Sequence, residues 1–223
     1  MLRVELHSHT IYSKDSLLRA ERLVDTCRRK GIDRVVITDH NTTAGGAYAQ
    51  RLDPGRVIVG EEIMTQAGEL LAFFVSQEVP PDLPPLEAIR RLRDQGAFIS
   101  VSHPYDQFRN GHWEEGDLLE ILPLVDAIET FNARCMRAEF NRQAGALARQ
   151  RGIPGTAGSD AHAAFEIGRA AMLLPDFYDA ESLRRALPQG QLDARLSSPF
   201  VHFTSRYAVW KKQLYRRQGK NLA

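Results

Sequence analysis

Two imidazoles stand at alternate positions in Val4-Glu5-Leu6-His7-Ser8-His9-Thr10, directly after a short apolar run. If residues 2–6 form a strand, its two-residue period sends His7 and His9 to the same side of the sheet, where both can reach one metal ion. Two histidines do not complete a metal site. The stretch therefore predicts a fold that brings ligands from distant segments to the end of the first strand.

Four further groups of ligand-type residues follow apolar, β-prone runs in the same way. They are Asp39-His40 after residues 35–38, Glu62 after 57–59, His103 after 98–101, and Asp160 with His162 after 153–157. Buried carboxylates are costly unless a cation compensates their charge. Histidine together with carboxylate suits zinc, manganese or iron, and more ligands than one ion needs indicate more than one ion.

Strands, polar strand ends and helices alternate along the chain, with about seven strands expected from the apolar runs. This alternation predicts an α/β protein with a largely parallel sheet and helical crossovers. A closed or nearly closed barrel fits best, because a barrel gathers the carboxyl ends of its strands around one mouth. An open doubly wound sheet is the alternative, but it would have difficulty bringing His7, Glu62, His103 and Asp160 to one point.

Three local patterns bear on the site. Asp15 and Ser16 are expected to cap the first helix. Residues 66–68 predict the tight turn of a hairpin that ends one strand and starts the next. The polar loop after His103 is either a substrate rim or an ordinary solvent loop, and it carries Tyr105, Asp106, Arg109, His112 and Trp113.

The composition of the 223 residues, 43% hydrophobic and 26% charged, is that of a globular protein with a substantial core. We expect one domain over residues 1–198 and a basic tail over residues 199–223, because no acidic residue follows Asp193 whereas seven Lys and Arg do. The tail is expected to form an amphipathic helix that docks on the barrel. The alternative is an arm that binds nucleic acid through basic and aromatic side chains.

The net charge of +1 neither favours nor excludes a polyanionic partner. The two cysteines, Cys27 and Cys135, form no metal-binding or catalytic motif, which is typical of reduced thiols in a cytosolic protein. No apolar run approaches the ~20 residues that cross a bilayer. We therefore expect a cytoplasmic protein without a membrane partner, and the sequence does not indicate the oligomeric state.

The sequence resembles the polymerase and histidinol phosphatase (PHP) superfamily from about residue 2 to residue 175. Four motifs occur in the order of the family, namely His7-Ser8-His9, Thr38-Asp39-His40-Asn41, Ser102-His103-Pro104 and Gly158-Ser159-Asp160-Ala161-His162. Gly60-Glu61-Glu62 matches the Gly-x-Glu of the family, whose Glu bridges metals. The resemblance implies a distorted seven-stranded β/α (TIM-like) barrel with two or three divalent ions, zinc, manganese or iron, at the carboxyl ends of its strands.

The resemblance also implies which residues bind each ion. One ion would be bound by His7, His9, Glu62 and Asp160, a second by the bridging Glu62 and His103, and a third by Asp15, His40 and His162.

One position departs from the family pattern. Many members have a second-metal histidine shortly after the Gly-x-Glu, whereas this chain has no histidine between His40 and His103. Glu69 stands where that ligand is expected, and its alternative role is a solvated turn residue. A carboxylate at this position would favour a harder ion such as manganese.

Three further residues are assigned roles in catalysis. Asp39 is expected to orient His40 or a neighbour from outside the metal shell. Arg134 and Arg169 lie beside strand ends, where a guanidinium could hold a phosphate, and their alternative is an ordinary surface position.

These expectations describe a metal-dependent phosphoesterase that uses a hydroxide bridging two ions and acts on a small phosphorylated metabolite or nucleotide. One alternative is a 5'-3' exonuclease-like phosphodiesterase acting on short oligonucleotides. Another is a non-catalytic, metal-containing binding module. Amide hydrolysis is less favoured, because no lysine follows the strands as a candidate for a carbamate bridge.

Overall fold

The computed structural model describes residues 1–219, and its nine strands form one sheet in the order β7-β6-β5-β4-β3-β2-β1-β8-β9. The strands are β1 (Leu2–Glu5), β2 (Arg34–Ile37), β3 (Val57–Met64), β4 (Glu69–Phe73), β5 (Phe98–Val101), β6 (Ala127–Asn132), β7 (Gly155–Gly158), β8 (Ala170–Leu174) and β9 (Gln191–Ala194). The helices are α1 (Ala20–Arg29), α2 (Ala44–Leu52), α3 (Pro85–Asp94), α4 (Glu115–Ile121), α5 (Ala138–Arg151), α6 (Ala180–Ala186) and α7 (Val201–Arg217).

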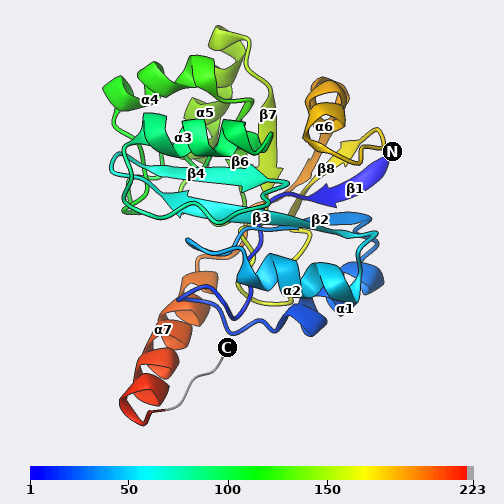
Figure 1. The fold of residues 1–223 in the computed structure, drawn as a ribbon, viewed down its shortest axis with the longest axis vertical. Coiled ribbons are helices and arrows are strands. Elements are labelled where there is room, and N and C mark those ends of the chain that lie inside the picture. Colours follow the sequence, from blue (N-terminus) through cyan, green and yellow to red (C-terminus); the bar gives the residue numbers. More distant parts are fainter. Residues whose placement is uncertain (220–223) are drawn as a thin grey trace.

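The sheet curves into a nearly closed barrel, which confirms the predicted fold (Figure 1). The segments that follow β1 and β7 meet, because Ser8 pairs with Ala161 in a parallel bridge and the amide of His9 donates to the Ala161 carbonyl at 2.9 Å. Strands β1 to β7 therefore surround the barrel axis. Strand β4 is antiparallel to both of its neighbours, and β8 and β9 extend the sheet antiparallel beyond β1.

Helices cover the outside of the sheet and bury apolar stripes against it. Helix α3 starts at a proline, which suits a first turn, and it buries Ala88, Ile89 and Leu92 in a cluster with β4 and β5. Burial of a leucine such as Leu92 contributes roughly 1.5–3 kcal/mol. Helix α5 ends at Gly152, whose φ of 65° is the left-handed conformation that terminates many helices.

Some element boundaries differ from the prediction. Helix α1 begins at Ala20, and the residue before it, Arg19, makes no side-chain cap. Asp15 and Ser16 are therefore not its N-cap, and they belong instead to a loop in which the Ser16 hydroxyl donates to the carbonyls of His9 and His162. Helix α4 and strand β9 were not predicted. The hairpin was predicted correctly, since β3 and β4 pair antiparallel around residues 65–68.

Helix α7 comprises most of the predicted tail, of which residues 220–223 lie outside the described part of the chain. Its first half contacts the barrel through the buried Val201 and Ala208, and Lys212 donates to the carbonyls of Ile11 and Ser13. The second half extends away from the body of the molecule (Figure 1). Within residues 1–219, no helix is both long enough and apolar enough to span a bilayer.

Candidate metal centre

Every predicted metal ligand lies on a segment that reaches the mouth of the barrel. His7 and His9 follow β1, His40 follows β2 and His103 follows β5, while Asp160 and His162 follow β7. Glu62 is within β3 at the point where a bridge joins it to His40. The left-handed φ of 51° at Asp160 is unusual for a residue other than glycine, and such strain is often found at functional sites.

Glu62 is the centre of the cluster and is almost wholly buried. Its Oε1 lies 3.3 Å from His7 Nε2 and 3.2 Å from His103 Nε2. Its Oε2 lies 3.3 Å from His9 Nε2 and 3.0 Å from His40 Nδ1. One carboxylate therefore contacts four imidazoles from three segments, which is the arrangement that a bridging ligand requires.

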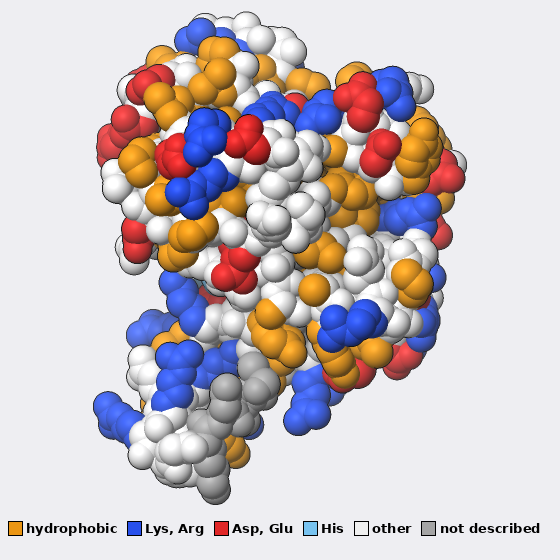
Figure 2. Space-filling model, viewed as in Figure 1, with side chains coloured by type: hydrophobic (Ala, Val, Ile, Leu, Met, Phe, Trp, Pro, Cys, Tyr) orange, Lys and Arg blue, Asp and Glu red, His pale blue; other side chains and the backbone are white. Residues whose placement is uncertain are grey.

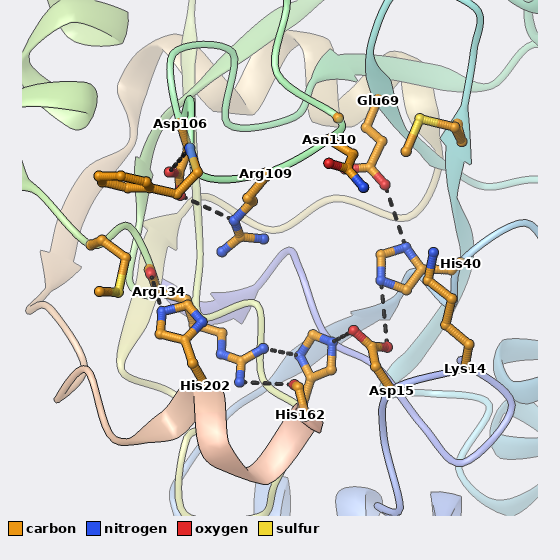
Figure 3. A pocket seen from close by; sticks show the side chains of 15 residues that line it. Lys14, Asp15, His40, Glu69, Asp106, Arg109, Asn110, Arg134, His162 and His202 are labelled. Atoms are coloured by element: carbon orange, nitrogen blue, oxygen red, sulfur yellow. Dashed lines mark hydrogen bonds and ion pairs between the residues drawn. The ribbon is translucent and has the colours of Figure 1, made fainter. Parts of the chain in front are cut away.

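Asp160 and Asp15 lie on two sides of this cluster. Asp160 Oδ1 is 3.2 Å from His9 Nε2 and 3.7 Å from His7 Nε2, so the first implied ligand set is assembled. Asp15 Oδ2 is 3.1 Å from His162 Nε2, and its Oδ1 is 3.5 Å from His40 Nε2, so the third set is assembled as well (Figure 3).

Glu69 is buried with 5% of its surface exposed, so it is not a solvated turn residue. Its two oxygens lie 3.7 Å from His40 Nδ1 and 3.5 Å from His103 Nε2. The ligand atoms of His40, Glu62 and Glu69 lie within 4.8 Å of one another. Glu69 therefore occupies the position from which it could replace the missing histidine.

Several buried ligand atoms form no well-aligned hydrogen bond within the described residues and face other ligand side chains instead. They are Glu62 Oε2, Asp160 Oδ1, Asp15 Oδ1 and His162 Nε2. Buried polar atoms rarely lack a well-aligned hydrogen bond, because no other interaction then compensates for the loss of hydration. Atoms that each lie about 2.1 Å from one ion are separated by roughly 3–4 Å, which is the spacing found here. The donor set therefore fits divalent cations.

Two hydrogen-bonded side chains fix the tautomers of the first two histidines. Glu129 Oε1 lies 2.9 Å from His7 Nδ1, so this nitrogen donates and Nε2 is free to bind a metal. Ser13 Oγ donates to Asp39 and lies 3.1 Å from His9 Nδ1. Asp39 therefore orients the neighbouring His9 through Ser13, whereas its carboxylate has no hydrogen bond with the His40 ring.

The carboxylates also determine which histidines carry protons when no cation is bound. Burial lowers the pKa of His7, but Glu62, Glu129 and Asp160 outweigh it and raise the pKa well above its usual value. The pKa of His40 is raised in the same way, with Glu62 outweighing burial. Burial and the charges of His162 and His40 lower the pKa of His9 to about 3.

Metal binding is therefore expected to release protons at pH 7. His7 and His40 have raised pKa values in the metal-free protein, so they are protonated at neutral pH and must lose protons to become ligands. Metal affinity should consequently rise as the pH rises from 6 to 8. Titration calorimetry in buffers of different ionisation enthalpy measures the released protons, and a binding enthalpy independent of the buffer would contradict the prediction.

The two arginines predicted to hold phosphate have other partners. Arg134 is buried, with Nη1 2.8 Å from His162 Nδ1, Nε 3.0 Å from Glu166 Oε2 and Nη2 donating to the Val201 carbonyl at 2.7 Å. It thus links His162 to α7. Arg169 donates to the carbonyl of Leu196 and does not line the pocket at the metal centre.

Arg109 is the arginine whose guanidinium lies between the polar loop and the metal centre (Figure 3). Its Nε donates to Asp106 at 3.1 Å, and its Nη1 donates to Asp160 Oδ2. The polar loop lines a pocket of about 450 Å³ together with Asp15, His40 and His162, so it forms a rim of the site.

Sequence reasoning missed Glu129 and left His202 unassigned. Glu129 has a recognisable signal, because it is a carboxylate inside the apolar strand β6. His202 donates from Nε2 to the Arg134 carbonyl at 3.1 Å and lines the pocket, but nothing in its local sequence indicates this.

Comparisons with known proteins match this chain to one family. The PHP domain family matches residues 5–79, and the PHP-associated family PHP_C matches residues 138–192. The uncharacterised protein MJ0417 of Methanocaldococcus jannaschii is 37% identical over 172 residues, which cover 76% of this chain and 69% of that protein.

Solved structures share the fold at low sequence identity. A two-domain protein from Bacteroides vulgatus, which contains a predicted PHP-like metal-dependent phosphoesterase, has a TM-score of 0.72 at 19% identity, over 93% of this chain and 69% of that one. PsfC from Pseudomonas syringae has a TM-score of 0.69 at 20% identity, over 95% and 99% of the two chains. With its motifs in the family order around one buried carboxylate, the chain belongs to the PHP family.

Proposed function

We propose that the protein is a metal-dependent phosphoesterase that hydrolyses the phosphate ester of a small metabolite or nucleotide. The observation that carries the proposal is the contact of Glu62 with four imidazoles, beside buried carboxylate oxygens that form no well-aligned hydrogen bond. Membership of the PHP family supports a hydrolase role.

Divalent ions bound here would lower the pKa of a coordinated water toward neutrality and stabilise negative charge on phosphoryl oxygens. The residues of the chain have separate tasks. Glu62 and the imidazoles would hold the ions, while Glu129 and Ser13 keep the Nε2 atoms of His7 and His9 directed at them. Because these partners are buried and hydrogen-bonded, the ligand geometry exists before substrate arrives.

The pocket also supplies positive charge for an anionic substrate. Lys14 and Arg109 line it together with the metal ligands, and Arg109 lies against Asp160. A guanidinium has five donors, so Arg109 retains others for phosphoryl oxygens while it pairs with Asp160. Arg109 therefore takes the role that the sequence suggested for Arg134 and Arg169.

Turnover with and without metal tests the proposal. Purified protein is assayed on nucleoside monophosphates, sugar phosphates and short oligonucleotides, with added manganese or zinc and after chelation. We expect phosphoester hydrolysis that chelation abolishes and manganese or zinc restores, because chelation removes the ions that this ligand set would hold. If metal-replete protein hydrolyses none of these three classes of substrate, the result would favour a non-catalytic binding module. Hydrolysis that persists in metal-free protein would contradict the site described here.

A further inference from the structure

A second hollow adjoins the metal-site pocket and shares one wall with it. It has a volume of about 520 Å³ and lies between α7, the segment after β7 and the loop before α1. His162, a candidate metal ligand, lines both hollows. The metal centre and the second hollow are therefore neighbours.

Three aromatic rings line this second hollow although they are largely exposed. Phe203 and Tyr207 come from α7, with 63% and 53% of their surface exposed, and Phe165 comes from the segment after β7, with 60% exposed. Exposed apolar patches around a hollow indicate a binding surface. Leu17 and Leu18 of the loop before α1 also line the hollow.

The charges around the rings favour an anionic, ring-bearing ligand. The exposed Arg22 lines the hollow, and the Lys211 ammonium lies 5.9 Å from the centre of the Tyr207 ring. On the face shown in Figure 2, Lys and Arg side chains gather over α7. Residues 201–217 contain five such cations and no acidic residue. This uniform charge disfavours the pairing of α7 with α7 of a second copy.

We propose that the second hollow binds the base of a nucleoside phosphate ester whose phosphorus lies at the metal centre. The inference rests on the proposed phosphoesterase function and narrows its substrate class. Every nucleobase is planar and can stack on an aromatic side chain. A cation beside the ring can pair with the attached phosphates. A phosphate at the metal centre and a base against Phe203 would be neighbours, because His162 lines both hollows.

Two substrates with the same leaving group isolate the contribution of the base. Thymidine 5'-(p-nitrophenyl phosphate) and methyl p-nitrophenyl phosphate both release p-nitrophenolate, but only the first has a base. The readout is the ratio of their kcat/KM values in metal-replete enzyme. We expect the wild-type protein to prefer the thymidine ester at least about tenfold.

Single substitutions in the hollow should remove this preference. Phe203→Ala and Tyr207→Ala are each expected to lower the ratio about tenfold, mainly through the KM for the thymidine ester, because each removes one stacking surface. Phe203→Tyr keeps a ring and should keep the ratio. Tyr178→Ala is the control, because Tyr178 is also an exposed ring, with 79% exposed, but lies just before α6 and does not line the hollow.

The outcomes separate this inference from the proposed function. If the wild-type protein hydrolyses the esters but Phe203→Ala leaves the ratio unchanged, the base site is wrong and the phosphoesterase stands. If Phe203→Ala leaves the ratio unchanged but abolishes sedimentation of the protein with phosphatidylserine vesicles, the rings bind a lipid surface and the inference is overturned.

If the wild-type protein hydrolyses neither diester, the panel of monoesters and oligonucleotides decides the proposed function, and binding decides the inference. Calorimetric binding of thymidine 5'-monophosphate by metal-replete protein should then weaken about tenfold in Phe203→Ala. Equal binding by both proteins would overturn the base site.

Discussion

The Glu62→Gln variant is expected to lose bound metal and to lose more activity than the ~10–100-fold that removal of an outer partner of a metal ligand costs. Glu62 is almost wholly buried and contacts His7, His9, His40 and His103. Glutamine has no charge, and its NH₂ group cannot bind a cation. The variant therefore disrupts every ion that the carboxylate would bridge. Plasma mass spectrometry of the purified protein measures metal per chain, alongside turnover.

The adjacent Glu61→Gln variant is the matched control. Strand geometry directs Glu61 to the opposite face of β3, where its Oε2 accepts from the Val79 amide at 3.0 Å. Burial raises the pKa of Glu61 to about 8, so the group is protonated at neutral pH and an amide resembles it. We expect metal content to be unchanged in Glu61→Gln. Full metal occupancy in Glu62→Gln would contradict the bridging role.

The Arg134→Met variant is expected to lose roughly 3–5 kcal/mol of stability, because removal of one partner leaves the other charge of a buried ion pair unpaired. The side chains of Arg134 and Glu166 are 3% and 0% exposed, and their atoms lie 3.0 Å apart. The substitution also removes the hydrogen bond to the Val201 carbonyl at the start of α7. Denaturant-induced unfolding measures the change in the free energy of unfolding.

Arg169→Met is the comparison, since Arg169 was assigned the same phosphate-binding role from sequence. Its guanidinium is partly buried and donates to a single carbonyl, that of Leu196, so we expect a loss of only ~1 kcal/mol. Equal destabilisation by the two substitutions would show that Arg134 does not have the supporting role described for it.

The ligand residues could be predicted because their signal is local. Each stands at the end of a buried run, and the parallel strands of a barrel bring such ends together whatever the lengths of the connections. His7, His40, His103 and Asp160 illustrate this, and their convergence on one carboxylate follows from the fold.

The partners of those ligands could not be predicted, because they depend on side-chain contacts between distant segments. Arg134 and Arg169 have similar positions beside strand ends, yet only Arg134 contacts His162, as α7 and Glu166 hold it there. The N-cap assignment of Asp15 was wrong for a related reason. Asp15 lies in a loop before α1, where its carboxylate contacts His162 from the distant segment after β7.

Anomalous diffraction from crystals soaked in manganese tests the central claim most directly. The account predicts peaks within about 2.0–2.3 Å of the Glu62 oxygens and of the surrounding imidazole nitrogens. It also predicts that these peaks are lost in Glu62→Gln and kept in Glu61→Gln. Manganese bound only elsewhere on an active enzyme, with no peak beside Glu62, would contradict the account.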